Sequence, residues 1–247
     1  MVFVKFFMKE VKILMTGFEP FGKFSENPSE DVARFFDGNI LWDCHIKGLI
    51  IPYDSRRIRE NFISHIDDIH PDYVFMMGQS LDPKQRDISL ERVASNWVDY
   101  EADNLYDNTG YRPDEGVITK NDGIKKHVTP DGEFLTMVGD RYTRISLDHI
   151  SRRISGRGID VNISEQCGTN FCNEAYYHSL GSERDFDHKT VFVHLPWYPN
   201  QMGFTGKWVS PILPKIIREK VYGGMDFNDQ IHTVRWILKY MTEAGSP

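Results

Sequence analysis

Short apolar runs alternate along the chain with longer segments that carry an apolar stripe. Short apolar runs bounded by Gly or Pro are typical of strands buried in a parallel sheet, and a stripe with a period near 3.6 is typical of an amphipathic helix. Strands are expected at residues 11–17, 46–52, 73–78, 88–96, 159–164 and 190–196, and helices at 27–38, 55–70, 142–156, 172–180 and 228–244. Strands that alternate with helices predict an α/β fold with a mostly parallel sheet covered on both faces.

The length of the chain, 247 residues, suits a single α/β domain. No repeat and no Pro/Ser-rich linker divides it, so we expect one domain over residues 1–247, with residues 1–10 as an extra N-terminal segment. Residues 100–140 are rich in Asp, Asn, Gly and Thr and show little periodicity. They predict a long loop near the site, which we expect to fold over the site and control entry.

Charge and cysteine content exclude several classes of function. The chain has 29 Lys and Arg against 36 Asp and Glu, a net charge of −7, and no basic run, which argues against a nucleic-acid partner. No apolar stretch is long enough to predict a membrane span. Cys44, Cys167 and Cys172 form no CxxC pair and no even set, so reduced thiols in a cytoplasmic protein are expected. The spacing of Cys167 and Cys172 does not suit zinc, and we expect no metal and no cofactor.

Two residues with nucleophile or base chemistry fall where an α/β sheet binds ligands, beyond the carboxyl ends of its strands. Cys172 opens a predicted helix, and His194 ends the last predicted strand. A helix start and a nearby imidazolium both favour the thiolate form, so Cys172 is a candidate nucleophile with His194 as its partner. The alternatives are a small buried Cys that packs the helix on the sheet and a structural His.

Glu91 is a candidate third member of this site. Alternation places Ile88 and Leu90 on one face of their strand and Glu91 on the other, where a carboxylate can orient an imidazole ring. The alternative is an ion pair of Glu91 with Arg92 or another surface Arg. Phe18 and Phe21 follow the first strand, either as walls of a slot for a small flat ligand or as ordinary core.

Four segments of the chain, taken in order, resemble the pyroglutamyl peptidase I family of cysteine peptidases. Residues 16–22 with 27–29 resemble the family's first strand, loop and helix start, and residues 88–96 its catalytic-Glu segment. Residues 164–173 resemble its nucleophile segment, and residues 193–201 its His segment.

The resemblance implies a fold, an activity and roles for these residues. The fold is a three-layer α/β/α sandwich without metal, often assembled as a homo-tetramer. The activity is removal of N-terminal pyroglutamate from peptides, with Cys172 as nucleophile, His194 as base and Glu91 as the residue that orients His194. Phe18 and Phe21 would hold the lactam ring of the substrate.

Two loops carry the remaining substrate-binding candidates and depart from the family pattern. Gln79 falls where the family has a polar residue beside the pocket, in a loop, residues 78–87, that differs from the family's. Residues 112–116 resemble a substrate loop of the family, with Arg112 displaced by one position after extra residues. Two alternative functions therefore stay open. One is that of a family member that acts on another capped N-terminus, and the other is that of a non-catalytic α/β protein that binds a nucleoside or another small molecule.

Overall fold

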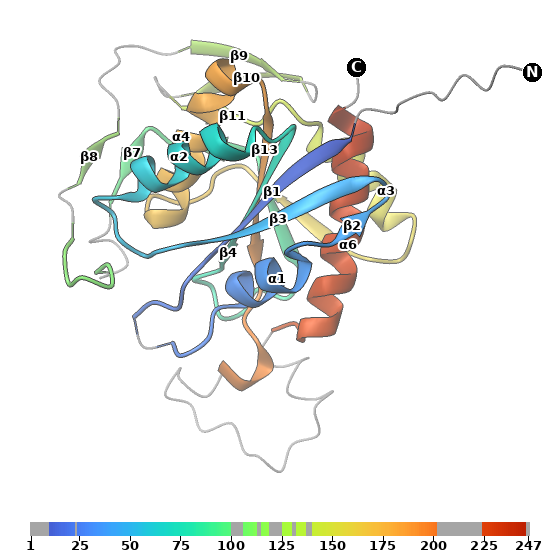
Figure 1. The fold of residues 1–247 in the computed structure, drawn as a ribbon, viewed down its shortest axis with the longest axis horizontal. Coiled ribbons are helices and arrows are strands. Elements are labelled where there is room, and N and C mark those ends of the chain that lie inside the picture. Colours follow the sequence, from blue (N-terminus) through green and yellow to red (C-terminus); the bar gives the residue numbers. More distant parts are fainter. Residues whose placement is uncertain are drawn as a thin grey trace, which may run out of the picture.

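The computed structural model describes residues 10–22, 24–99, 106–112, 115–118, 125–129, 132–136, 140–201 and 224–245 (Figure 1). This part of the chain contains a seven-stranded sheet with the order β12-β5-β13-β4-β1-β3-β2. Its strands are β1 (Val11–Phe18), β2 (Ile40–Leu41), β3 (Cys44–Ile51), β4 (Tyr73–Gln79), β5 (Ile88–Glu91), β12 (Val161–Ser164) and β13 (Lys189–Leu195). The predicted extra segment at residues 1–10 lies, except for Glu10, outside the described residues.

The sheet is mostly parallel, as predicted, but three of its strands run against the others. β3, β1, β4 and β13 are parallel neighbours. β5 is antiparallel to β13 and parallel to β12, while β2 is antiparallel to β3. The carboxyl ends of β5 and β12 therefore do not lie at the same edge as those of β1, β4 and β13, which corrects the assumption of one common edge.

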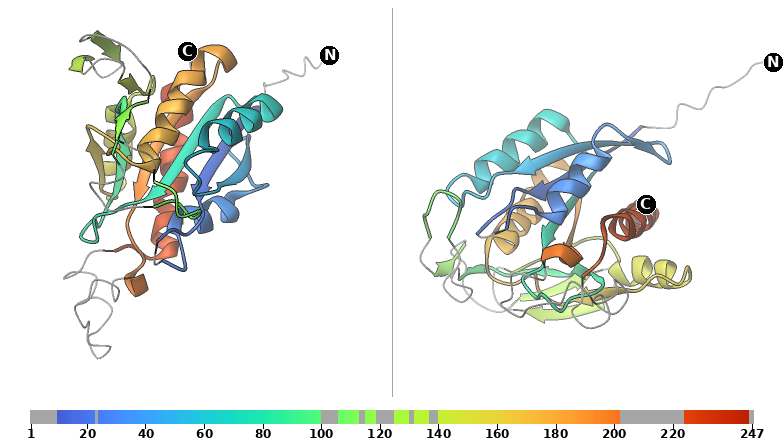
Figure 2. Two further views of the ribbon diagram at one scale, coloured as in Figure 1. Left: turned by 90° about the vertical axis from the view of Figure 1, so that its left-hand side faces the viewer. Right: turned by 90° about the horizontal axis from the view of Figure 1, so that it is seen from below.

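Helices cover both faces of the sheet and make a three-layer α/β/α fold, as predicted (Figure 2). One face is covered by α1 (Pro28–Phe36), α3 (Leu147–Ser155) and α6 (Phe227–Gly245), and the other by α2 (Ile58–Ile69) and α4 (Phe171–Phe186). Among the helices that the structure describes, none has the length and apolar character needed to cross a bilayer.

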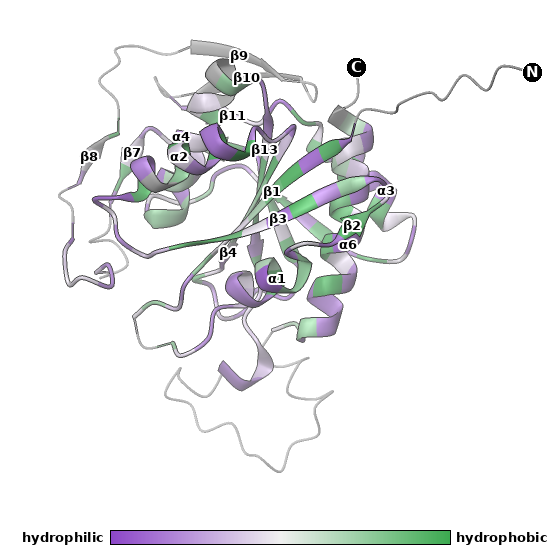
Figure 3. Cartoon of the chain, viewed as in Figure 1, coloured by the Kyte–Doolittle hydropathy of each residue, from purple (hydrophilic) through white to green (hydrophobic). Residues whose placement is uncertain are grey.

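Burial on both sides explains the continuous apolar runs of the central strands (Figure 3). Every residue of β4 is buried. Its side chains alternate between the two cores: Phe75 packs with the layer of α1, α3 and α6, while Val74 and Met76 pack with α2 and α4. Gly78 continues the second series and therefore lies on the face of the sheet covered by α4.

A tight junction joins β1 to α1. The Asn27 side chain caps the helix, because its Oδ1 accepts from the backbone N of Ser29 at 3.0 Å. The Ser29 hydroxyl in turn accepts from the backbone N of Phe18 at 3.0 Å. A Cβ on Gly17 would lie 2.0 Å from the carbonyl oxygen of Ser29, so this close approach needs glycine. The junction fixes the loop in which Phe21 lies.

Among the predicted elements, three are shortened most. The strand at residues 88–96 divides after Glu91, because β6 (Val93–Ala94) pairs with β11 (Arg141–Tyr142) outside the main sheet. The helix predicted from Ser55 begins only at Ile58, since the backbone N and hydroxyl of Ser55 are hydrogen-bonded to Asp107. The helix predicted from Tyr142 begins at Leu147, after its N-cap Ser146.

The prediction of a loop over residues 100–140 is wrong where the structure describes them as strands. β8 (Gly116–Val117) pairs with β7 (Trp97–Val98), and β9 (Lys125–Thr129) pairs with β10 (Gly132–Thr136). Much of the remainder, including residues 100–105 and 119–124, lies outside the described residues, so the expected control of entry stays a prediction.

Candidate active site

Glu91 and His194 form a hydrogen-bonded pair on the α4 face of the sheet. Glu91 Oε1 lies 2.8 Å from His194 Nδ1, and the Glu91 side chain is buried, with a relative exposure of 2% for the residue. β5 and β13 are antiparallel, and Glu91 lies opposite Phe192. His194 comes two positions after Phe192 on the same face of the sheet, so the Glu91 carboxylate reaches it. Arg92, the alternative partner of Glu91, pairs instead with Asp148 and Glu165.

Cys172 completes a line of three groups. It is the second residue of α4, it is half-buried, and it lies close enough to His194 to raise the pKa of that imidazole. Gly78 lies directly opposite His194 in the neighbouring strand β4. A Cβ on Gly78 would come within 2.8 Å of the Cys172 sulfur, so glycine leaves the room that the thiol occupies.

Opposing effects set the charge of His194. Burial lowers the pKa of this imidazole, but its interaction with Cys172, and its hydrogen bond and charge interaction with Glu91, raise the pKa to about 10. The ring is therefore an imidazolium at neutral pH, between a carboxylate and a sulfur. This arrangement places a sulfur nucleophile beside an imidazolium that a carboxylate orients.

A second thiol, Cys167, lies in the same region but has a different character. It is buried, and burial together with the charges of Glu91 and Cys172 raises its pKa well above the ordinary value. Cys167 is therefore held as a neutral thiol, which leaves Cys172 as the nucleophile that the geometry favours.

A cavity of about 260 Å³ opens beside Cys172 and His194, and aromatic rings form part of its wall. The rings belong to Phe21, Tyr53 and Phe171. Tyr53 stacks on Phe21, with centroids 4.9 Å apart, and on Phe171, with centroids 4.1 Å apart. Phe18 contacts Phe171 edge-on at 5.4 Å and is not one of the residues that line the cavity, so it supports this wall from behind.

Gln79, at the end of β4, also lines the cavity. Its Oε1 accepts from Gln201 Nε2 at 3.2 Å, while its own buried Nε2 has no hydrogen-bond partner among the residues that the structure describes. Gln201 is itself fixed, because its Oε1 accepts from the backbone N of Tyr198 at 2.8 Å. The amide group of Gln79 is thus held with a free donor in the wall of the cavity, where a bound carbonyl oxygen would satisfy it.

Arg112 is not brought to the cavity by the structure. Its guanidinium group lies over the ring of Tyr106, 5.0 Å from the centroid, and Arg112 is not among the lining residues.

Sequence reasoning did not single out Tyr53, Phe171 or Gln201. Tyr53 stands two positions after the end of β3 and Phe171 directly before Cys172, so the rule on strand ends and helix starts selects both positions.

Among the residues that the structure describes, no group of three His, Cys, Asp or Glu side chains is placed to hold a metal ion. The donors closest to Cys172 in sequence are the backbone N–H groups of the first turn of α4. Such groups have no acceptor within their own helix, so they are available to an oxyanion formed beside the sulfur.

Comparisons with known proteins agree with this geometry. The family model for pyroglutamyl peptidase matches residues 11–221. The pyrrolidone-carboxylate peptidase of Pyrococcus furiosus is 27% identical over 235 residues, which cover 94% of this chain and 99% of that protein. The enzyme of the same name from Vibrio campbellii is 31% identical over 191 residues, covering 77% and 80% of the two chains.

The fold also matches that of solved structures. The crystal structure of pyrrolidone carboxyl peptidase from Pyrococcus furiosus superposes with a TM-score of 0.76 at 25% identity, and the match covers 96% of this chain and 100% of that one. The structure of the enzyme from Thermococcus litoralis gives a TM-score of 0.75 and covers 94% of each chain. The family model spans well over half of the sequence, and the chain belongs to the pyroglutamyl peptidase family.

Proposed function

We propose that this protein is a cysteine exopeptidase that removes pyroglutamate from the N-terminus of peptides. The observation that carries the proposal is the hydrogen bond between Glu91 and His194, with Cys172 and His194 lining one cavity that has an aromatic wall. The names of its relatives, pyrrolidone-carboxylate peptidases, support the same activity.

The cavity suits the lactam ring of a pyroglutamyl residue. The ring is small, flat and uncharged, so it can lie against Phe21, Tyr53 and Phe171 without loss of ionic hydration. The free amide N–H of Gln79 is a donor for the lactam carbonyl. A peptide with an ordinary N-terminus would bring an ammonium group against this wall and would leave the Gln79 donor unpaired, which disfavours it.

In the proposed reaction, the Cys172 sulfur attacks the carbonyl carbon that joins the pyroglutamyl residue to the next amino acid. Backbone N–H groups at the start of α4 stabilise the oxyanion, a contribution of about 3 kcal/mol for each donor. His194 then gives its proton to the leaving amine, so the peptide bond breaks and a thioester remains. The neutral His194 ring, held by Glu91, next takes a proton from water, and the resulting attack releases pyroglutamate.

The test of this function is hydrolysis of a pyroglutamyl-arylamide reporter. We expect the wild-type chain to release the arylamine and Cys172→Ser to lose turnover, because the serine hydroxyl is far less acidic than a thiol. A chelator should leave the rate unchanged. Retained activity in Cys172→Ser, or a wild-type chain that cleaves only reporters with a different capped N-terminus, would contradict the proposal.

A cytoplasmic location and a homo-tetrameric assembly belong to the same proposal. All three cysteines are free thiols, and a reducing compartment keeps a thiol nucleophile in its active form. Size-exclusion chromatography with light scattering measures the assembly directly. A monomer that hydrolyses the reporter at full rate would show that the site needs no partner subunit.

A further inference from the structure

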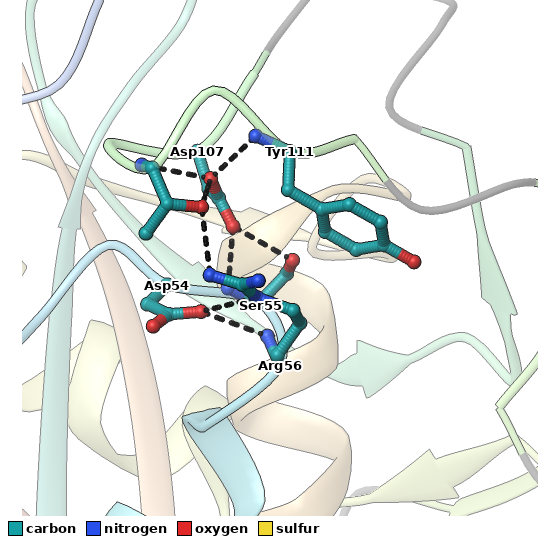
Figure 4. A network of polar contacts seen from close by, with 6 residues as sticks. Asp54, Ser55, Arg56, Asp107 and Tyr111 are labelled. Carbon is teal, nitrogen blue, oxygen red and sulfur yellow. Dashed lines mark hydrogen bonds and ion pairs between the residues drawn. The ribbon is translucent and has the colours of Figure 1, made fainter.

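The segment Tyr106–Tyr111, called here the clamp segment, is held against the loop before α2 by one buried carboxylate (Figure 4). Asp107, 4% exposed, accepts through Oδ1 from the backbone N of Thr109 at 2.9 Å, from its hydroxyl at 2.5 Å and from the backbone N of Tyr111 at 2.9 Å. Through Oδ2 it accepts from the hydroxyl of Ser55 at 3.0 Å and from its backbone N at 3.2 Å. One side chain thus orders the clamp segment and attaches it to a second part of the chain.

These hydrogen bonds also keep Asp107 charged. Burial raises the pKa of this carboxyl, but donation by Thr109, Tyr111 and Ser55 outweighs burial and lowers the pKa below its ordinary value. Hydrogen bonds to a charged acceptor are stronger than those to a neutral one, so the attachment is firm at neutral pH.

Arg56 closes the same attachment from the outer side (Figure 4). Its Nη2 donates to the hydroxyl of Thr109 at 3.0 Å, and its guanidinium lies over the ring of Tyr111, 5.4 Å from the centroid. The backbone N of Arg56 donates to Asp54 Oδ1 at 3.1 Å. Both loops of the contact are therefore ordered by bonds within themselves as well as between them.

Asn108 links the clamp segment to the residues around the substrate cavity. Its backbone N donates to the carbonyl oxygen of Tyr53 at 2.8 Å, and its Nδ2 donates to Glu19 Oε1 at 2.7 Å and to the carbonyl of Pro20 at 3.0 Å. Glu19 Oε1 accepts in addition from the backbone N of Tyr53 at 2.8 Å. The N–H and the carbonyl of Tyr53 are thus both fixed, one by Glu19 and the other by Asn108.

Tyr53 links this contact to the catalytic residues. It is buried, it lines the cavity, and it stacks on both Phe21 and Phe171. Phe171 is the neighbour of Cys172 in the first turn of α4. A shift of the Tyr53 backbone would therefore change the aromatic wall beside the sulfur.

We propose that Asp107 and Asn108 are positioning residues for substrate binding, which hold Tyr53 against Phe21 and Phe171 so that the aromatic wall is formed before the substrate enters. Neither residue lines the cavity, so both act through Tyr53. Order present in the free enzyme does not have to be created on binding, and affinity rises accordingly. The proposal rests on the proposed function and adds the residues that make its lactam site rigid.

The test is the effect of Asn108→Ala and Asp107→Asn on the separate kinetic constants for a pyroglutamyl-arylamide. We expect KM to rise about tenfold and kcat to stay within about twofold, because losing ordering bonds weakens binding while Glu91, Cys172 and His194 stay in place. The inhibition constant of free pyroglutamate, which fills only the lactam site, should rise by the same factor as KM.

Asn39→Ala is the matched control. Asn39 also uses its side-chain amide to bind a backbone carbonyl, that of Phe35 at 2.7 Å, but it lies after α1 and away from the cavity. We expect it to change the melting temperature without changing KM. Asn108 is exposed, so Asn108→Ala decides the question even if Asp107→Asn fails to fold. Wild-type KM and inhibition constant in Asn108→Ala would overturn the proposal, whereas a wild-type chain without turnover would contradict the function instead.

Discussion

At His194, burial and charge act in opposite directions, and charge prevails. Desolvation of the imidazolium lowers the pKa, while Cys172 and Glu91 together raise it to about 10. The ring therefore begins the reaction with the proton that the leaving amine needs. It becomes a base only after that proton has gone, which is the order that thiol acylation followed by hydrolysis requires.

Glu91→Gln tests the contribution of the carboxylate to this balance. The neutral amide keeps the size of Glu91 but removes its charge, so the pKa of His194 should fall from about 10 toward 6.5. The imidazolium is present below its pKa, so the alkaline limb of the kcat profile should move to lower pH. We expect kcat to fall by roughly 10²–10⁴-fold, measured with the reporter across pH 6 to 10.

Glu165→Gln is the control for that profile, since Glu165 pairs with Arg92 beside the site and does not line the cavity. It should keep both the rate and the alkaline limb of the wild type. An unchanged limb in Glu91→Gln would mean that Glu91 does not govern the charge of His194.

Gly78→Ala tests the space that the nucleophile occupies. The new methyl group would lie 2.8 Å from the Cys172 sulfur and 3.0 Å from Cζ of Phe192, so the thiol must move. A displacement of about 1 Å can lower a rate by about 100-fold, and we expect a loss of kcat of that order. At Gly116 no described residue other than its chain neighbours lies within 4 Å of an added Cβ, so Gly116→Ala should leave kcat unchanged. A fully active Gly78→Ala would show that the sulfur position is not critical.

The catalytic residues were easier to predict from the sequence than the aromatic residues that line the cavity. The motifs identified Cys172, His194 and Glu91, and the structure brings these three together. Phe18 is an aromatic residue of the same motif as Phe21, yet it lies behind Phe171. Which of two rings faces a cavity depends on side-chain packing with residues distant in sequence, and local sequence does not contain that information.

At the scale of elements, apolar periodicity predicted where most strands and helices lie but not the direction of β5 and β12. A buried strand shows the same apolar run in either direction, so the pattern does not show which way the strand runs. The direction of β5 shows only in its antiparallel pairing with β13, and that of β12 in its parallel pairing with β5. The alternation within β5 nevertheless placed Glu91 on the correct face, because the faces of a strand do not depend on its direction.

The start of α1 should contribute to both stability and substrate binding. Asn27 Oδ1 caps the helix at Ser29 and accepts from the Ser29 hydroxyl at 2.8 Å, and its Nδ2 donates to the carbonyl of Glu19 at 3.2 Å. We expect Asn27→Ala to lower the free energy of unfolding by about 1 kcal/mol, as measured by urea denaturation. Because Glu19 also holds Tyr53, KM should rise. A KM equal to that of wild type would show that the cap of α1 does not affect the substrate cavity.

At the scale of the whole molecule, the two helical layers have different relations to the site. The cavity residues Phe21, Tyr53 and Phe171 belong to the core that α2 and α4 make with the sheet. α3 and α6 pack on the opposite face and contribute no residue to the cavity lining. The sheet therefore separates a layer that bears the site from a layer whose main contribution is apolar burial.

This separation predicts that equivalent losses of core volume have different functional effects on the two faces. Ile237 of α6 and Ile58 of α2 are both buried, in the core opposite the cavity and in the core that includes Tyr53 respectively. Ile237→Ala and Ile58→Ala should each lower the free energy of unfolding by about 2–5 kcal/mol in urea denaturation. At 25 °C, where both variants remain folded, only Ile58→Ala should raise KM for the reporter. The void that this substitution leaves lies in the core that includes Tyr53, so relaxation around the void can move Tyr53. Equal increases of KM in the two variants would show instead that the sheet transmits packing changes to the site from either face.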